Sequence, residues 1–170
     1  MELRKTIGIV FQNPENQILF NNVYDDLAFA LNNLELDDKE LRIKQGLEKV
    51  KMETYIDKNT YELSLGQKQR ITIAGVIAIN PKYIVFDEPT TMLDSEGKED
   101  VYNIISNLKS NGYTVVYVTN VVNEILMSDR IITIDNGEIQ SIFNKEDIVE
   151  NIYALEKSRN KNTYYCSDAV

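Results

Sequence analysis

Residues 83–94 read YIVFDEPTTMLD, and this stretch decides how the rest of the chain is interpreted. Its first four residues are apolar, which is typical of a strand buried on both faces of a parallel sheet. The strand ends at Asp87 and Glu88, because Pro89 removes a backbone donor and fixes φ. Ligands of open α/β sheets sit at the carboxyl ends of the strands. The stretch therefore predicts an α/β fold with a site at this point.

The two acids suggest a chemistry for that site. Adjacent carboxylates beside a dry strand repel each other and lose hydration, and a divalent cation with a water molecule would relieve both problems. Asp87 is the candidate Mg²⁺ ligand, since this cation prefers carboxylate oxygen and retained waters. Glu88 is the candidate base for the water. Taken alone, the pair is equally typical of a cap that opens a turn.

Two further segments point in the same direction. Residues 63–70 read LSLGQKQR, and residues 9–17 read IVFQNPENQ. Together with residues 83–94 they resemble the nucleotide-binding domain of ABC transporters, in particular the ATPase (A) component of energy-coupling-factor transporters, which import cobalt, nickel and vitamins. The resemblance runs from about Leu3 to Ile142. It implies a P-loop NTPase-like ABC ATPase domain, α/β in class, with a mostly parallel sheet flanked by helices and a helical subdomain, incomplete at its amino terminus.

The resemblance also implies roles for single residues. Asp87 and Glu88 match the end of the Walker B strand, as Mg²⁺ ligand and catalytic base. Gln12 matches the Q-loop glutamine, which contacts the metal and the water. Ser64 to Gln67 match the signature, which faces the γ-phosphate of ATP held by the opposite subunit, and Leu93-Asp94 matches the D-loop. The implied cofactors are ATP and Mg²⁺, and the residues implied to contact the nucleotide are Gln12, Ser64, Leu65, Gly66, Gln67 and Asp94.

Two positions depart from the family pattern. Leu65 stands where the family has glycine, and its side chain should crowd a backbone that must approach phosphate closely. Ser64-x-x-Gln67 remains, which is also an ordinary capping box at a helix N-terminus, where phosphate binds well. Asn120 stands where the family has a histidine, and its amide can donate a hydrogen bond but carries no charge. We expect a weakened signature and Asn120 in the catalytic place of that histidine.

A P-loop is missing from the 170 residues. The motif Gly-x-x-x-x-Gly-Lys-Ser/Thr cradles phosphates, whereas the single pair Gly97-Lys98 is followed by Glu99 and has Met92 in place of the first glycine. The resemblance implies the carboxyl-terminal portion of a longer A component, from a truncated gene, a split gene or a partial gene model. We expect the chain alone not to bind Mg-ATP. We also expect marginal stability, because the family's P-loop strand lies inside the sheet beside the strand matching Thr114–Thr119.

The chain is expected to be a single partial ABC ATPase domain, residues 1–170. By resemblance, residues 16–61 form the helical subdomain that docks on transmembrane partners, although an ordinary helix pair packing on its own domain fits equally well. Residues 62–142 carry the signature, Walker B, D-loop and switch region, and residues 143–170 a carboxyl-terminal helix and tail.

Local patterns predict the elements of secondary structure. The helix over Asn22–Leu34 is expected to bury Val23, Leu27, Phe29, Ala30 and Leu31. The next helix is expected to start at Asp37 or Asp38, with Glu40 completing a cap on Asp37, and to bury Ile43, Leu47 and Val50. The other expected elements are strands over Lys5–Phe11 and Thr114–Thr119, helices over Ser64–Ile79 and Lys98–Leu108, a hairpin of Arg130–Asp135 and Glu138–Ile142 around Asn136-Gly137, a last helix capped by Asn144 and running through Leu155, and a loosely ordered Arg159–Val170.

Composition limits the classes of function. Lys and Arg number 18 and Asp and Glu 27, so the net charge of −9 argues against nucleic acid as a partner. Cys166 is the only cysteine, which excludes a disulfide framework and fits a reducing cytoplasm. No apolar run approaches the roughly 18 residues of a membrane span, and no signal peptide is recognisable. We therefore expect a peripheral place at the cytoplasmic face of the membrane, reached through partners.

The resemblance names those partners and leaves the activity open. They are a second A-component ATPase in a dimer, the transmembrane T component and the substrate-binding S component. The chain is interpreted as an ATP-binding and ATP-hydrolysing subunit of a micronutrient importer, inactive alone. The alternatives are a non-catalytic partner that offers Ser64–Gln67 to another subunit's ATP, and a gene remnant without function.

Overall fold

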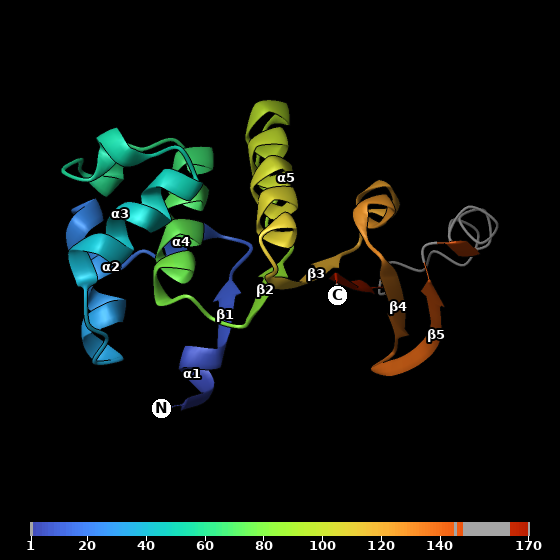
Figure 1. Cartoon of the computed structure of the whole chain (residues 1–170). Helices are drawn as coiled ribbons and strands as arrows, with labels where there is room; N and C mark the ends of the chain where they lie inside the picture. Colours follow the sequence, from blue (N-terminus) through green and yellow to red (C-terminus); the bar gives the residue numbers. More distant parts are fainter. Residues whose placement is uncertain (1, 145, 148–163, 170) are drawn as a thin grey trace.

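The computed structural model describes residues 2–144, 146–147 and 164–169, and for residues 164–169 only the backbone is considered. Among these residues, six strands form one sheet in the order β1-β2-β3-β6-β4-β5. The strands are β1 Ile7–Val10, β2 Tyr83–Asp87, β3 Thr114–Thr119, β4 Arg130–Asp135, β5 Glu138–Asn144 and β6 Tyr164–Ala169. Figure 1 shows the first helices gathered beside β1, and the β4–β5 hairpin at the opposite end of the sheet.

Strands β1, β2 and β3 form a parallel half of the sheet, with Ile7 paired to Tyr83 and Tyr83 to Thr114. The sequence predicted that β2 would be buried on both faces, and this is only partly right. Ile84 and Phe86 are fully buried in the main hydrophobic cluster, whereas the alternate residues Tyr83 and Val85 are half-buried. Helix α5 (Ser95–Ser110) contributes Val101, Ile104 and Leu108 to that same cluster and contacts the neighbouring strand β3.

The start of the chain differs from the predicted strand over Lys5–Phe11. Lys5 and Thr6 belong to the short helix α1 (Glu2–Thr6), and the strand that follows stops at Val10. Its stop leaves Phe11 and Gln12 outside the sheet, where a short 3-10 helix, η1 (Pro14–Asn16), continues the chain. Phe11, Gln12 and Asn13 follow β1, and Pro14 then opens η1; proline cannot donate to a strand ladder, so the strand could not extend through it.

Helices α2 (Val23–Asn33) and α3 (Lys39–Lys49) lie where they were predicted, with two errors in detail. Phe29 is 39% exposed and Ala30 is half-buried, because the buried stripe of α2 follows Val23, Leu27, Ala28 and Leu31 instead. The predicted cap on Asp37 is wrong, because Asp38 occupies the N-cap position.

Asp38 adopts a left-handed φ of 57° and makes no side-chain capping bond, whereas Arg42 Nε donates to the Asp37 carbonyl at 2.8 Å beside this helix end. The predicted buried positions Ile43, Leu47 and Val50 are confirmed. The chain then passes through two 3-10 turns, η2 (Glu53–Tyr55) and η3 (Thr60–Glu62).

Helix α4 (Leu65–Ile79) begins at the predicted capping box. The Gln67 N–H donates to Ser64 Oγ, and the Ser64 N–H donates to Gln67 Oε1 at 3.0 Å. The helix is fully enclosed by its neighbours over much of its length, with Ile71, Ile73 and Ala74 at 0% exposure. It contacts α2 and α3 as well as β1, so it joins the helices to the sheet.

Strands β4 and β5 confirm the predicted hairpin. Asn136 and Gly137 adopt positive φ values of 51° and 80°, as a two-residue turn of this kind requires. Asn144, the predicted cap of the last helix, is the last residue of β5 and is paired with Arg130. The rest of the predicted helix through Leu155 lies almost wholly outside the described residues.

Strand β6 overturns the expectation that Arg159–Val170 is loosely ordered, as far as its described part goes. Tyr164–Ala169 lies between β3 and β4 and pairs antiparallel with both, Ser167 opposite Tyr117 and also opposite Ile131. The backbone groups that β3 and β4 turn toward each other are thereby paired. The two unpaired rows expected from the sequence are therefore absent among the described strands, and the expectation of marginal stability loses its reason.

Candidate functional site

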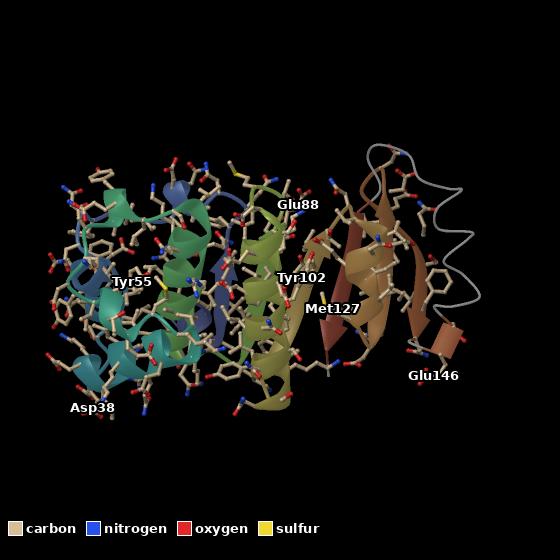
Figure 2. The ribbon with its side chains drawn as sticks, turned by 90° about the horizontal axis from the view of Figure 1, so that it is seen from above. Asp38, Tyr55, Glu88, Tyr102, Met127 and Glu146 are labelled. Atoms are coloured by element: carbon tan, nitrogen blue, oxygen red, sulfur yellow. The ribbon has the colours of Figure 1, made fainter. Side chains whose placement is uncertain are left out.

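The candidate residues after β1, β2 and β3 lie at one edge of the sheet, because these strands are parallel. Val10 pairs with Phe86 and Asp87 pairs with Val118, so each strand ends at nearly the same level. Gln12, Glu88 and Asn120 follow these strand ends within one or two residues. The structure thus collects side chains separated by up to 108 positions in the sequence at one place. Figure 2 labels Glu88 at this edge.

The carboxylate of Glu88 is held by two donors. Gln12 Nε2 donates to Glu88 Oε2 at 2.9 Å, and Thr91 Oγ1 donates to the same oxygen at 3.1 Å. The backbone N–H of Glu88 donates to the Val118 carbonyl at 2.9 Å. Its φ of 45° is in the left-handed region, a strained conformation that is found mainly where the surrounding structure fixes it at functional sites. Glu88 is therefore oriented from its side chain and its backbone.

Asp87 and Gln12 suit a hard cation. Asp87 is the exposed last residue of β2, and Gln12 is also exposed, with its amide nitrogen engaged by Glu88. Carboxylate and amide oxygens are ligands that Mg²⁺ accepts while it keeps several waters. No group of three or more His, Cys, Asp or Glu residues arranged to hold a metal occurs in the described part of the chain. A cation here would thus need ligands from water or a bound phosphate as well.

Asn120 is half-buried and directly follows β3. The backbone around it is fixed, since the Val121 N–H donates to Thr119 Oγ1 at 3.0 Å and Thr119 is almost fully buried. A side chain placed beside Glu88 in this way can donate an amide hydrogen bond to an anionic ligand.

The remaining candidates form a second group around the start of α4. Ser64, Leu65, Gly66 and Gln67 line a hollow of about 390 Å³ together with Asp94 and neighbouring residues of α5. Asp94 caps α5 by accepting from the Gly97 N–H at 2.9 Å, so two helix N-termini border the hollow. Exposed N–H groups and aligned dipoles at such ends favour anions.

Contacts between the two groups could not be read from the sequence. Lys68 Nζ in α4 pairs with Glu15 Oε1 at 2.5 Å, and the buried Gln69 donates from Nε2 to the Phe11 carbonyl at 3.2 Å. Both contacts tie the segment that carries Gln12 to the helix that begins at Ser64. The lysine and glutamine look like ordinary helix residues in the sequence, and only their partners 53 and 58 positions away reveal their role.

Comparison with known proteins agrees with this geometry. The ABC transporter family model matches residues 1–91, more than half of the chain. The chain belongs to the ABC transporter family. It is 44% identical over 158 residues to the energy-coupling factor transporter ATP-binding protein EcfA1 of Mesomycoplasma hyopneumoniae strain 7448, which covers 88% of this chain and 58% of that protein. It is 37% identical over 172 residues to EcfA of Pediococcus pentosaceus, with 96% and 61% covered.

Solved structures of the ABC transporter family share the fold. One is cbiO1 from Clostridium perfringens, described as part of the ABC transporter complex cbiONQ, with a TM-score of 0.80, 32% identity, and 92% of this chain and 64% of that chain covered. Another is the ATP-binding cassette MJ0796 in a dimeric post-hydrolysis state bound to ADP and Pi, with a TM-score of 0.71, 29% identity, and 84% and 64% covered. The predicted family and fold are confirmed. The chain spans about three-fifths of the length of the curated relatives.

Proposed function

We propose that this chain is the ATP-binding and ATP-hydrolysing subunit of an energy-coupling-factor importer of metal ions or vitamins. The observation that carries the proposal is the hydrogen bond from Gln12 to Glu88, which aims a carboxylate from the end of β2 at the edge where ligands of such sheets bind. The similarity to two energy-coupling factor ATP-binding proteins supports it.

In this proposal the residues at the strand ends divide the reaction between them. Glu88 accepts a proton from the attacking water, and Gln12 and Thr91 hold the Glu88 carboxylate in place. Asn120 donates an amide hydrogen bond to an oxygen of the terminal phosphate. Asp87 and the Gln12 amide oxygen would hold Mg²⁺, which supplies charge neutralisation at the phosphate when it is bound.

The hollow at Ser64–Gln67 is proposed to face a nucleotide held by the second subunit of a dimer. The capping box leaves the first N–H groups of α4 at the rim of the hollow, where a phosphate would meet them. Leu65 is half-buried and adds bulk at that rim. Asp94 at the start of α5 is proposed to meet the partner at the same place.

Residues 16–61 are proposed to dock on the transmembrane T component, which with the S component would hold the chain at the cytoplasmic face of the membrane. Leu19, Phe20 and Phe29 are 65%, 38% and 39% exposed, and the two phenylalanine rings lie 5.1 Å apart. Leu19 and Phe29 border a hollow of about 290 Å³. Such an exposed apolar cluster suits a protein partner. Within the part of the chain that the structure describes, no helix has the length and apolar character to cross a bilayer.

A second candidate function is a non-catalytic subunit that only completes the partner's ATP site. It requires only the capping box at Ser64, which is fully formed. In that case no nucleotide binds beside Glu88, and Ser64–Gln67 is the part of this chain that contacts the ATP held by the partner.

The test is ATP hydrolysis by the chain assembled with a second A component and the membrane subunits. With a partner whose own catalytic base is disabled, Glu88→Gln should lower phosphate release by roughly 100-fold or more, while Glu53→Gln, the same change at an exposed position, should not. Ser64→Ala is compared with an intact partner. If only Ser64→Ala lowers the rate, the second candidate is correct, and a rate insensitive to both variants contradicts both.

A further inference from the structure

A buried carboxylate that the catalytic assignment does not use lies directly behind the strand ends. Glu124, in the 3-10 helix η4 (Val122–Met127), is only 7% exposed. Its oxygens accept hydrogen bonds from Thr90 Oγ1 at 2.6 Å, from Tyr102 Oη at 2.7 Å and from Thr119 Oγ1. Together with Tyr117, these residues are called the Glu124 cluster below.

The direction of each hydrogen bond in the Glu124 cluster follows from the supply of protons. An ionised carboxylate only accepts, so the hydroxyl protons of Thr90, Tyr102 and Thr119 all point at Glu124. Tyr117 Oη and Thr90 Oγ1 are 3.2 Å apart, and because the Thr90 proton is already used, Tyr117 is the donor. Thr119 Oγ1 in turn accepts from the Val121 N–H. These hydrogen bonds therefore connect the Val121 backbone, through the Thr119 hydroxyl, to the Glu124 carboxylate.

The donors come from segments that flank the proposed catalytic residues. Thr90 lies two residues after Glu88, in the turn where the Leu93 N–H donates to the Thr90 carbonyl at 3.1 Å. Thr119 directly precedes Asn120. Tyr102 belongs to α5, and in Figure 2 it lies toward the side of α5 that faces β3 and η4. One carboxylate thus fixes the turn after Glu88 and the loop that carries Asn120 relative to each other.

We infer that Glu124 is a positioning residue, whose carboxylate sets the distance between Glu88 and Asn120 by gathering the Thr90 and Thr119 hydroxyls. The inference rests on the proposed function only in what the two positioned residues do. A carboxylate serves this purpose because its two oxygens accept three hydroxyl protons at once. The amide of glutamine has the same shape but only one oxygen, and it would leave the Thr119 proton without an acceptor. Hydrogen bonds to a buried charge are also stronger than those to a neutral amide.

The test uses the full chain and residue-resolved amide hydrogen exchange, which needs no nucleotide. In Glu124→Gln, exchange of the Val121 and Leu93 amides should speed up by about tenfold or more, as expected for loss of a charge-assisted hydrogen bond. The Met52 amide, in a fully buried part of the helical region and bonded to the Leu47 carbonyl at 2.9 Å, reports overall stability and should be unchanged. Glu138→Gln removes the same charge at an exposed site and should change none of the three.

Two outcomes would overturn the inference. If Val121 and Leu93 exchange at the original rate, Glu124 holds neither segment. If all three amides speed up equally, Glu124 contributes only to general stability. Should Glu124→Gln fail to fold, Tyr102→Phe decides in its place: it removes one donor and should speed up Val121 and Leu93 by a smaller factor than the isosteric change, again without affecting Met52.

A rate measurement then separates this inference from the proposed function. In the assembled transporter used above, Glu124→Gln should lower kcat for ATP hydrolysis and leave KM for ATP within about twofold, because positioning acts on the reaction step. If the amide exchange changes as expected but no ATP hydrolysis depends on Glu88, the positioning role is correct and the proposed function is wrong. If hydrolysis depends on Glu88 but Glu124→Gln changes neither the amide exchange nor kcat, the proposed function is correct and the positioning role is wrong.

Discussion

The two halves of the sheet differ in the direction of their strands. In the parallel half, β1, β2 and β3 end at one edge, and the residues that follow them make the candidate site. In the antiparallel half, β6, β4 and β5 pair in alternating directions, and none of the proposed catalytic residues follows those strands. Parallel strands bring distant sequence segments to one edge, whereas a hairpin mainly brings its own neighbours together. The chemistry is thus expected in the parallel half, and the antiparallel half is expected to support it.

The largest expected effect is at Asn120, which follows β3, the last strand of the parallel half. Asn120→His restores a group that can carry charge beside the terminal phosphate, and in the assembled transporter it should raise ATP hydrolysis by about tenfold or more. Asn123→His is the matched control: it places the same side chain three residues further on, at an exposed position of η4, and should leave the rate unchanged. Steady-state phosphate release measures both. Equal effects of the two variants would show that the position after β3 has no special role.

The next effect concerns the strand that joins the two halves. Ser167 pairs with both Tyr117 and Ile131, and a strand with neighbours on both sides uses the N–H of every residue. Ser167→Pro should therefore lower the free energy of unfolding by about 1–3 kcal/mol, as expected for a lost and partly unsatisfied hydrogen bond. Ser167→Thr keeps the N–H and should be close to neutral. Urea unfolding decides, and equal midpoints for all three proteins would mean that Tyr164–Ala169 is not a central strand.

A smaller effect is expected where α3 meets α4 in the helices that accompany the parallel half. A Cβ atom on Gly46 would lie 2.6 Å from the Ala74 carbonyl oxygen, whereas one on Gly66 would meet nothing closer than 3.6 Å. Gly46→Ala should cost about 1–2 kcal/mol of stability, since overpacking costs about 1–3 kcal/mol and alanine regains up to about 1 kcal/mol of helix propensity. Gly66→Ala should be neutral or slightly stabilising. Thermal or urea unfolding of the pair would contradict this if both changes had the same sign and size.

The smallest effect is a pH dependence at the Glu124 cluster. Burial, and then the hydrogen bond to Glu124, raise the pKa of Tyr102 to about 12, and burial raises the pKa of Tyr117 as well. The folded protein therefore keeps these protons longer than the unfolded chain. The contribution of Tyr102 to stability is complete below about pH 10 and is lost as the pH rises through about 12.

Absorbance of tyrosinate during alkaline titration of the folded chain measures this effect. Tyr102 should give a late step, which is a rise in tyrosinate absorbance at high pH, and Tyr102→Phe should remove it. Glu124→Gln should move that step toward lower pH, because the Glu124 carboxylate is one cause of the raised pKa of Tyr102. Tyr61→Phe, at a side chain that is 74% exposed, should leave the late step in place. A late step that survives Tyr102→Phe unchanged would show that another tyrosine produces it.

Local chemistry made much of the parallel half predictable. The apolar run that ends at Asp87 and Glu88, the capping box at Ser64 and the strand Thr114–Thr119 are each written in a few adjacent residues. The Asn136-Gly137 turn did the same for the hairpin. Motif resemblance added Gln12 and Asn120 to the candidate site, and the parallel register then placed both at the edge that carries Glu88.

The errors arose where neighbours outweigh local preference. Asp37 with Glu40 has the spacing of a cap, but the chain turns at Asp38 with a left-handed φ, so the side-chain bond is not made. Phe29 fits an apolar stripe, yet it is 39% exposed because α2 is rotated so that Ala28 is buried instead. A one-residue choice of this kind costs little locally, and the packing partner decides it.

Sequence by itself therefore determined the family and the mostly parallel sheet, through motif resemblance, and the acids at the end of β2, because these are written in side-chain chemistry within a few adjacent residues. Only the tertiary structure decided that Tyr164–Ala169 completes the sheet, that Gln12 holds Glu88, and that hydroxyl groups from three segments meet around Glu124. The physical reason is that a hydrogen-bonding group must find a partner once it is buried, and that partner is chosen by proximity in the folded chain.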